Sequence, residues 1–107
     1  IKYYFIDDKK NGEFIRYHKN GDIYYKCYYI DDKLNGEYID YYENGNIRNK
    51  CYYVDDRKIG ESILYHKNGN MACNFYYIDN KKNGERISYN KHINIEYKYY
   101  FIDDYEI

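Results

Sequence analysis

Apolar and polar side chains alternate along residues 12–18 (GEFIRYH), and the same alternation returns every 24 residues along the chain. A period of two predicts a β-strand that buries one of its faces. One parity holds Ile15 and Tyr17 and stays constant in the later copies, as Ile39, Tyr41, Ile63, Tyr65, Ile87 and Tyr89. The other parity varies, for example as Phe14, Tyr38, Ser62 and Arg86. We therefore expect the constant parity to be packed and the variable parity to face water.

Residues 22–30 (DIYYKCYYI) form a second alternating segment, whose more apolar parity is Ile23, Tyr25, Cys27 and Tyr29. Tyr, Ile and Val favour strands, and the Asn-Gly pair that separates the two segments argues against a continuous helix. An Asn-Gly pair between two alternating segments predicts a β-hairpin.

Two forms fit the turn at Lys19-Asn20-Gly21: a two-residue type I′ turn on Asn-Gly, or a three-residue loop with Gly21 left-handed beside a bulge. They differ by one residue, which exchanges the faces of the strand. We favour the three-residue loop because it sets Tyr17 opposite Ile23. It also sets Ile15 opposite Tyr25, so that the constant apolar residues share a face. On the variable face it gives the pairs Arg16 with Tyr24, Asp40 with Arg48 and Leu64 with Ala72.

The second connection, residues 31–36 (DDKLNG), is expected to be a longer polar loop in which Asp and Asn side chains bond to their own backbone. All connections are short, so successive strands should be neighbours in one sheet. A fixed period of this length is the signature of a repeat array. We predict an all-β fold, an elongated single-layer antiparallel β-meander built from 24-residue β-hairpin repeats. It has about nine strands and, at ~4.8 Å per strand, a length of roughly 40 Å.

A single array is expected to occupy residues 1–107, with no linker. It consists of a partial repeat 1–11, the repeats 12–35, 36–59 and 60–83, and a degenerate repeat 84–107. In the last repeat Ile93 replaces the turn glycine found as Gly21, Gly45 and Gly69. A β-branched residue avoids the left-handed conformation, so we expect the fourth hairpin to be distorted.

Charge is nearly balanced, with 17 Lys and Arg against 18 Asp and Glu. The phosphate attraction that dominates nucleic-acid binding therefore has no source, and neither does adhesion to an anionic membrane. No apolar run approaches the ~20 residues of a membrane-spanning helix, and no secretory leader is visible. We expect an intracellular location or a place in a virus particle.

Residues able to carry chemistry are spread along the array. The Asp pairs at 7–8, 31–32, 55–56 and 103–104 fit turns better than calcium loops. His18 and His66 are four strands or ~19 Å apart, and His92 has no partner. Cys27 and Cys51 are about 9–10 Å apart with a strand between them, too far for a disulfide, so these and Cys73 should be free thiols. We predict no catalytic residue, metal site or cofactor, and no enzymatic activity.

The 20 Tyr residues exceed what one thin core requires. Tyr suits a sheet wetted on both faces, since its ring is apolar and its hydroxyl polar, and the same rings can also bind a partner. The candidate partner-binding residues are Tyr17, Tyr41, Tyr65, Tyr89, Tyr29, Tyr53 and Tyr77. Residues 1–6 and 97–102 would be edge strands, open to another protein or to further copies of this chain.

The pattern G-E-x-I-x-Y-x-x-N-G-x-I, followed by a strand ending in Tyr-Ile-Asp-Asp, resembles the MORN repeat, in the variant found in bacterial antitoxin-like proteins and in large DNA viruses. The matching positions are the leading glycines (Gly12, Gly36, Gly60, Gly84), the aromatic at Tyr17 and its equivalents, the Asn-Gly turns, and the closing aromatic at Tyr29 and its equivalents. The resemblance implies a scaffold or protein-interaction module, for example a structural component of a virus particle. The alternatives are an antitoxin-like inhibitor of a partner protein and a module that binds a glycan or a lipid headgroup.

Overall fold

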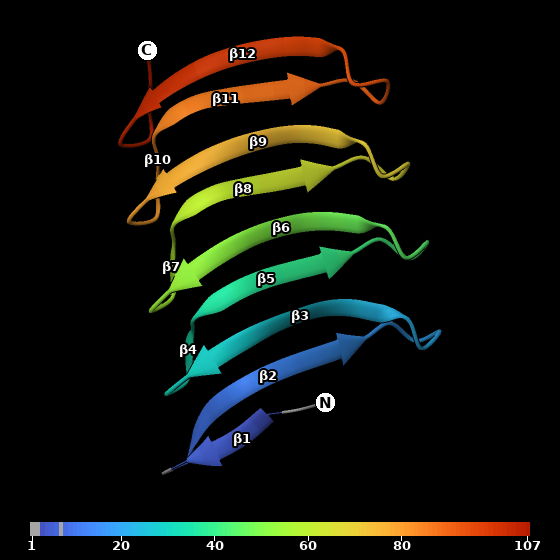
Figure 1. Cartoon of the computed structure of the whole chain (residues 1–107), viewed down its shortest axis with the longest axis vertical. Helices are drawn as coiled ribbons and strands as arrows, with labels where there is room; N and C mark the ends of the chain where they lie inside the picture. The colour runs from blue at the N-terminus through green and yellow to red at the C-terminus, as the bar shows by residue number, and fades with distance from the viewer. Residues whose placement is uncertain (1–2, 7) are drawn as a thin grey trace.

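The computed structural model describes residues 3–6 and 8–107, and each element in this part of the chain is a β-strand (Figure 1). The longer strands are β1 (Tyr3–Ile6), β2 (Lys9–Tyr17), β3 (Ile23–Ile30), β5 (Gly36–Tyr41), β6 (Ile47–Val54), β8 (Gly60–Tyr65), β9 (Met71–Ile78), β11 (Gly84–Tyr89) and β12 (Ile95–Ile102). They are the nine strands that the alternation predicts. Two-residue strands follow alternate long strands, namely β4 (Lys33–Leu34), β7 (Arg57–Lys58), β10 (Lys81–Lys82) and β13 (Tyr105–Glu106).

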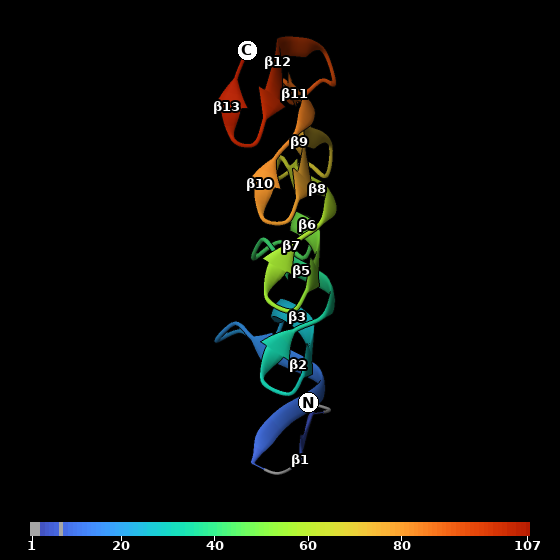
Figure 2. The same ribbon diagram turned by 90° about the vertical axis from the view of Figure 1, so that its left-hand side faces the viewer.

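The long strands form one open antiparallel sheet in the order β1-β2-β3-β5-β6-β8-β9-β11-β12. Each strand lies beside its neighbour in the sequence, because every connection is too short to reach further, and the predicted meander is confirmed. The molecule measures 46 × 34 × 14 Å. Seen along its edge, the sheet is a single layer, and the short strands project to one side of it (Figure 2).

The first Asn-Gly turn is the predicted three-residue loop. The N–H of His18 donates to the carbonyl of Asp22 at 2.7 Å, and the N–H of Gly21 donates to the carbonyl of His18 at 3.0 Å. Gly21 has a φ of 94°, a conformation that glycine adopts without steric cost. The loops at 42–46, 66–70 and 90–94 make the same two hydrogen bonds.

The fourth turn keeps this geometry although Ile93 occupies the glycine position. The N–H of Asn90 donates to the carbonyl of Asn94 at 2.9 Å, and the N–H of Ile93 donates to the carbonyl of Asn90 at 3.0 Å. The prediction of a distorted hairpin is therefore wrong. Instead Ile93 itself is held at a φ of 66°, which costs an L-residue about 1–2 kcal/mol.

The predicted register of β2 and β3 is right beside the turn and wrong beyond it. Tyr17 pairs with Ile23, but a bulge leaves Tyr24 unpaired, and Ile15 then lies opposite Lys26 rather than Tyr25. The same shift occurs between β5 and β6, β8 and β9, and β11 and β12. Because one extra residue reverses the facing of everything beyond it, Tyr25, Cys27 and Tyr29 lie on the opposite side of the sheet from Ile15.

The two sides of the sheet can be named by these residues. The cysteine face carries Cys27, Cys51 and Cys73; the isoleucine face carries Ile15, Ile39, Ile63 and Ile87. The variable parity of the first strand lies on the cysteine face, and two of its members, Asp40 and Ser62, are only 4% exposed. The prediction that this parity faces water is therefore wrong. Both parities are packed, since Ile39 on the other face is also buried.

Aromatic rings pack in a row along the cysteine face. The ring centroid of Phe14 lies 6.1 Å from that of Tyr25, Tyr25 stacks on Tyr38 at 5.7 Å, and Tyr38 meets Tyr53 at 6.1 Å. The short strands project to one side of the sheet (Figure 2), and cations next to them lie over these rings. Lys58 lies 5.1 Å above Tyr77, for example, a contact worth ~0.5–1 kcal/mol where exposed.

The second connection is a tight turn, not the longer loop that the sequence predicts. Asp31 and Asp32 have φ values of 48° and 67°, as in the two-residue turns that join hairpin strands. They reverse the chain between β3 and β4, which pair through Ile30 with Lys33.

The second Asp of each turn bonds to the preceding repeat rather than to its own backbone, contrary to prediction. The Asp32 carboxylate accepts from the N–H of Lys10 at 2.6 Å, and the N–H of Asp32 donates to the carbonyl of Lys10 at 3.0 Å. The equivalent pairs are Asp56 with Leu34, Asn80 with Lys58 and Asp104 with Lys82. Of the predicted pair 7–8, Asp7 lies outside the described residues. The second turns thus form a ladder that joins each repeat to the one before it.

Candidate interaction surfaces

The seven tyrosines predicted to bind a partner do not form one surface. Tyr17, Tyr41, Tyr65 and Tyr89 share a parity with the isoleucines and lie on the isoleucine face, next to the Asn-Gly turns. Tyr29, Tyr53 and Tyr77 lie beyond the bulge on the cysteine face. A flat partner can therefore contact one of these groups but not both.

The second of these groups is largely taken up by packing. Burial raises the pKa of Tyr29 to about 12 and the pKa of Tyr53 to about 12, and it also raises the pKa of Tyr77. Lys10 lies 5.0 Å above the Tyr29 ring. These half-buried rings stabilise the repeat, and their hydroxyls stay protonated at neutral pH.

A regular row of exposed tyrosines escaped the prediction. Its members, Tyr28, Tyr52, Tyr76 and Tyr100, are 42%, 50%, 49% and 47% exposed. Each pairs with a glutamate of the neighbouring strand on the isoleucine face, and the Tyr28 hydroxyl donates to the Glu13 carboxylate at 2.9 Å. Each Tyr forms an aromatic doublet with the residue that follows it, and in the last two repeats Phe75 and Tyr99 also precede the doublet. That doublet is the signal in the sequence, but without the bulge its first member cannot be assigned to a face.

Paired charges flank the isoleucines on the same face. The Lys50 ammonium lies 3.9 Å from the Glu37 carboxylate, and Lys98 lies 3.3 Å from Glu85. Such exposed ion pairs contribute little to stability, ~0–1 kcal/mol, but they cancel the charge of the surface. The isoleucine face is therefore an apolar stripe with aromatic and neutralised polar borders, the arrangement found in protein–protein interfaces.

The three cysteines are buried thiols with no features of a nucleophile. Cys27 and Cys51 are 1% and 3% exposed, and β5 lies between their strands as predicted. Burial raises the pKa of Cys27, Cys51 and Cys73. A thiol that stays protonated is a weak nucleophile, so these residues act as small apolar packing groups.

The histidines take separate positions in the turns. His66 Nε2 lies 2.8 Å from the carbonyl of Tyr89, and the His18 ring stacks on Tyr24 with centroids 4.7 Å apart. Across residues 3–6 and 8–107, no three His, Cys, Asp or Glu side chains are grouped so as to hold a metal ion.

Side chains join the Asn-Gly turns of successive hairpins at two of the three junctions. Between the second and third hairpins, Asn44 and Asn46 donate to the carbonyl of Lys67 at 2.9 and 2.8 Å, and the Tyr42 hydroxyl donates to the carbonyl of Tyr65. The next junction repeats the pattern, with Asn68 and Asn70 bonded to Lys91 and His66 bonded to Tyr89.

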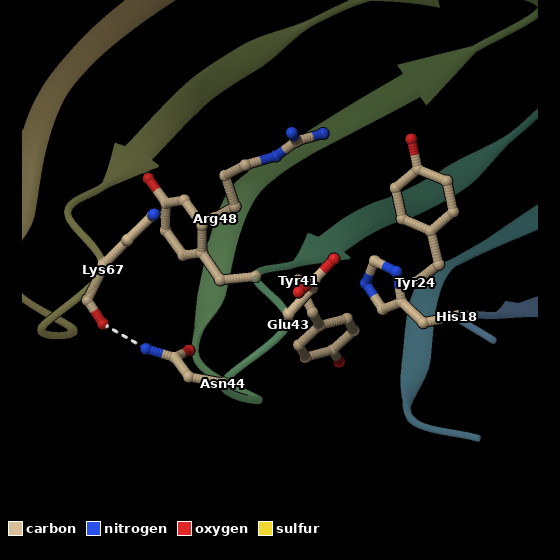
Figure 3. Close-up of a pocket in the computed structure, with 8 residues that line it drawn as sticks. His18, Tyr24, Tyr41, Glu43, Asn44, Arg48 and Lys67 are labelled. Carbon is tan, nitrogen blue, oxygen red and sulfur yellow. Dashed lines mark hydrogen bonds between the residues drawn. The ribbon is translucent and has the colours of Figure 1, made fainter. Parts of the chain in front are cut away.

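The first junction is open. Asp22 stands at the position of Asn46, and the Asn20 amide donates to the Asp22 carboxylate at 3.2 Å instead of reaching the next turn. His18 Nε2 is buried without a hydrogen-bond partner in the described part of the chain. A groove of about 710 Å³ opens here, lined by His18, Tyr24, Tyr41, Tyr42, Glu43, Asn44, Arg48 and Lys67 (Figure 3). Hollows of about 370 and 340 Å³ flank the same two turns.

A comparison with known protein families identifies the type of these repeats. A family profile described as MORN repeat variant matches residues 10–31 and 34–55. MORN repeats serve as protein-interaction or membrane-binding modules and are generally non-enzymatic. No curated protein matches the chain. The described residues include no helix long and apolar enough to cross a membrane. The strands and turns of the two matched segments return, shifted by 48 residues, at 58–79 and 82–103. Residues 10–31 and 34–55 are therefore MORN repeats of the variant type, and the rest of the chain continues the same structural repeat.

Proposed function

We propose that the array is a non-enzymatic scaffold that docks another protein on its isoleucine face. The observation that carries this proposal is the row of Tyr28, Tyr52, Tyr76 and Tyr100, each about half exposed although its neighbours in the strand are packed. Exposed aromatic rings beside an apolar stripe are typical of the residues that dominate binding energy in protein interfaces.

The isoleucine face suits a partner better than the cysteine face. The short strands project to one side of the sheet (Figure 2), and cations carried by them lie over rings of the cysteine face. Lys82 of β10, for example, lies 4.8 Å from the centroid of Phe75. In the described part of the chain, the cations found over rings all lie on the cysteine face. A partner can therefore contact the exposed tyrosines of the isoleucine face without displacing such a cation.

The balance of charge favours a protein over a membrane or a nucleic acid. Glu37 and Glu85 pair with the lysines that stand beside them on the isoleucine face. A surface without excess positive charge lacks the attraction that both anionic lipids and phosphate backbones require.

The edge of the sheet offers a second contact of the same kind. Along β12, Ile95 and Tyr97 are 62% and 58% exposed. On its outer side the described part of the chain pairs only Phe101 and Ile102, with β13, and the remaining open edge can add a further strand. The occupant is another protein or a further copy of this chain. Sedimentation velocity of the 107-residue protein tests self-pairing, which predicts concentration-dependent dimers; a monomer at all concentrations and salt levels contradicts it.

The test of face binding is quantitative affinity capture from cells of the source, with the double variant Tyr52→Ser/Tyr76→Ser. Tyr105→Ser is the matched control, since Tyr105 is more exposed, at 78%, and lies on β13. Circular dichroism melts establish that all three proteins fold. The recovered partner is then titrated by calorimetry.

We expect the wild type and Tyr105→Ser to bind the same protein with equal affinity. The double variant should bind at least about tenfold more weakly, because aromatic anchors contribute ≥ ~1 kcal/mol each. Equal binding by the double variant, or vesicle binding in place of protein binding, would refute the proposal.

A further inference from the structure

Six of the seven glycines in this chain directly follow an asparagine. Asparagine is a thermolabile residue, and its side chain can lose ammonia without an enzyme. A following glycine favours the reaction, because the attacking atom is its own backbone nitrogen and no Cβ hinders the approach. The structure distinguishes the six asparagines by the groups that hold their side chains.

The modification needs only water. The glycine nitrogen loses its proton to hydroxide and attacks Cγ of the asparagine. The bond from this nitrogen to Cγ forms, the bond from Cγ to the side-chain nitrogen breaks, and that nitrogen leaves as ammonia with a proton from water. Water then opens the cyclic imide at one of its two carbonyls, which gives aspartate or isoaspartate. A side chain held by hydrogen bonds must break them before it can react.

Three of the asparagines lie beside the second turns and are held by the following repeat. Asn35 Oδ1 accepts from the N–H of Asp55 at 3.0 Å, and Asn35 Nδ2 donates to the Asp55 carboxylate at 3.3 Å and to the Lys33 carbonyl at 3.4 Å. Asn11 and Asn83 accept from the equivalent N–H groups, at 3.1 and 3.0 Å. All three are half-buried. Their conversion requires the separation of two repeats.

The other three asparagines lie in the Asn-Gly turns and are exposed. Two of them are joined to the next hairpin through the nitrogen that has to leave. Asn44 Nδ2 donates to the Lys67 carbonyl at 2.9 Å (Figure 3), and Asn68 Nδ2 donates to the Lys91 carbonyl at 2.9 Å.

The glycine nitrogens do not distinguish the three turns. The N–H groups of Gly21, Gly45 and Gly69 each donate to the carbonyl three residues earlier, at 3.0, 3.0 and 2.9 Å. Any difference in reactivity between these turns therefore comes from the asparagine side chain.

The side chain of Asn20 bonds only within its own loop. Its Nδ2 donates to the Asp22 carboxylate at 3.2 Å, and its Oδ1 accepts from the N–H of Asp22 at 3.0 Å. A hollow of about 370 Å³, lined by His18, Lys19, Asn20 and Glu43, gives water access to this side chain. The first turn can therefore open without breaking a side-chain contact with the next hairpin.

We propose that Asn20 is the residue at which this protein deamidates first. The free energy of local opening controls how often a side chain reaches a reactive conformation. Asn44 and Asn68 each have one further hydrogen bond to break, so they should convert about three- to tenfold more slowly. The inference is independent of the proposed function, since Asn20 lies in a turn and outside the row of exposed tyrosines.

The product changes the first junction. Conversion replaces the amide donor by a carboxylate beside Asp22, so that an attractive contact of 3.2 Å becomes a repulsive one. It also adds a negative charge to the hollow that Glu43 lines. Isoaspartate in addition lengthens the main chain of the turn. With age the first turn therefore becomes more acidic and less firmly held.

The test is incubation of the whole 107-residue protein at mildly alkaline pH, followed by peptide mapping with mass spectrometry. The protein denatured in urea supplies the reference rate of each asparagine, because it has the same local sequence without the structure. We expect the ratio of folded to denatured rate to be highest at Asn20, by about three- to tenfold over Asn44 and Asn68. An equal or higher ratio at any other asparagine would overturn the proposal.

Two reciprocal variants test the physical cause. Asp22→Asn gives the first loop the Asn-Gly-Asn sequence of the second and should slow the conversion of Asn20. Asn46→Asp gives the second loop the sequence of the first and should speed the conversion of Asn44. Circular dichroism melts establish that both variants fold. Unchanged ratios, or changes of the opposite sign, would contradict the role of the bond to the next hairpin.

Asn20→Gln is the control for the assignment. Glutamine at this position forms the cyclic imide far more slowly because its side chain is longer by one methylene. The variant should lose the fastest phase of ammonia release and keep the slower phases. A fast phase that persists in Asn20→Gln would place the reactive residue elsewhere and refute the proposal.

Discussion

The Arg48 guanidinium holds the Asp40 carboxylate through two hydrogen bonds, from Nε to Oδ1 and from Nη2 to Oδ2, each of 3.1 Å. Asp40 is 4% exposed, whereas the Arg48 side chain is 45% exposed. In the next repeat the equivalent residues are Leu64 and Ala72. The same two positions of the repeat are therefore filled by a charged pair in one copy and by an apolar pair in the next.

Removing the arginine alone should be costly. Arg48→Ala leaves the Asp40 carboxylate buried without its partner, and we expect the free energy of unfolding to fall by about 2–4 kcal/mol. The lower part of that range reflects the half-exposed arginine, which water screens. Urea denaturation followed by circular dichroism measures the change.

The double variant Asp40→Leu/Arg48→Ala is the matched control, since it installs the pair of the next repeat. It should recover most of the lost stability, because a packed apolar pair often replaces a buried ion pair without loss. A double variant less stable than Arg48→Ala would show that the pair is not interchangeable.

Ile93→Gly should stabilise the protein. Glycine relieves the strain of a φ of 66° but adds freedom to the unfolded chain, so the net gain is about 1 kcal/mol. The reverse change at an equivalent turn, Gly45→Ala, should destabilise the protein by about 1 kcal/mol through the backbone alone, since an added Cβ would meet no atom within 4 Å. Thermal melts of both variants test the two predictions. A melting temperature of Ile93→Gly below that of the wild type would show that Ile93 is not strained.

The ladder of second turns predicts a difference between two substitutions of Asp56. Its carboxylate accepts from the N–H of Leu34 at 2.7 Å, and Asn80 makes the same contact with Lys58 at 3.3 Å. Asp56→Asn should therefore be tolerated. Asp56→Ala loses the acceptor and places alanine at a φ of 66°, which should cost about 1–3 kcal/mol. Equal stability of the two variants in denaturant titrations would show that the inter-repeat bond contributes nothing.

Stability should fall at alkaline pH. Burial raises the pKa of the three thiols above their usual 9.0 and that of Tyr29 and Tyr53 from 10.0 to about 12. A group whose pKa is raised in the folded state stabilises it fully below the unfolded pKa and loses that contribution as pH rises through the folded pKa. The urea midpoint should therefore be level below about pH 9 and decline toward pH 12.

Tyr53→Phe removes one of these groups and should make the decline above about pH 10 shallower. A urea midpoint that rises between pH 9 and pH 12 would contradict the prediction, because ionisation of buried thiols and phenols must destabilise the folded state.

The alternation and the Asn-Gly turns were enough to predict the nine long strands, their order and the three-residue loop. The bulge at Tyr24 was not predictable, because both registers place apolar residues together: Ile15 beside Tyr25 in one, Phe14 beside Cys27 in the other. The choice depends on packing between repeats, where Tyr25 stacks on Tyr38. That one residue decides which tyrosines share a face.

The candidate sites show the same limit. The Asp pairs indicate a turn, but the partner of Asp32 lies one repeat earlier, at Lys10. Rules based on neighbouring residues in the sequence do not predict a contact over that separation. The open first junction leaves a trace in the sequence as Asp22 in place of Asn46. The meaning of this substitution is clear only once the structure shows that Asn46 bonds to the next turn.

The thinness of the sheet, 14 Å across and 46 Å along the stack, has a final consequence. A ribbon with no enclosed interior cannot recognise a molecule by surrounding it, but it displays an identical tyrosine once per two strands, roughly every 10 Å. If a partner docks on this face as proposed, it would be selected by the spacing of its own contact groups. Insertion or deletion of one 24-residue unit would change the number of tyrosines displayed without changing the interval between them.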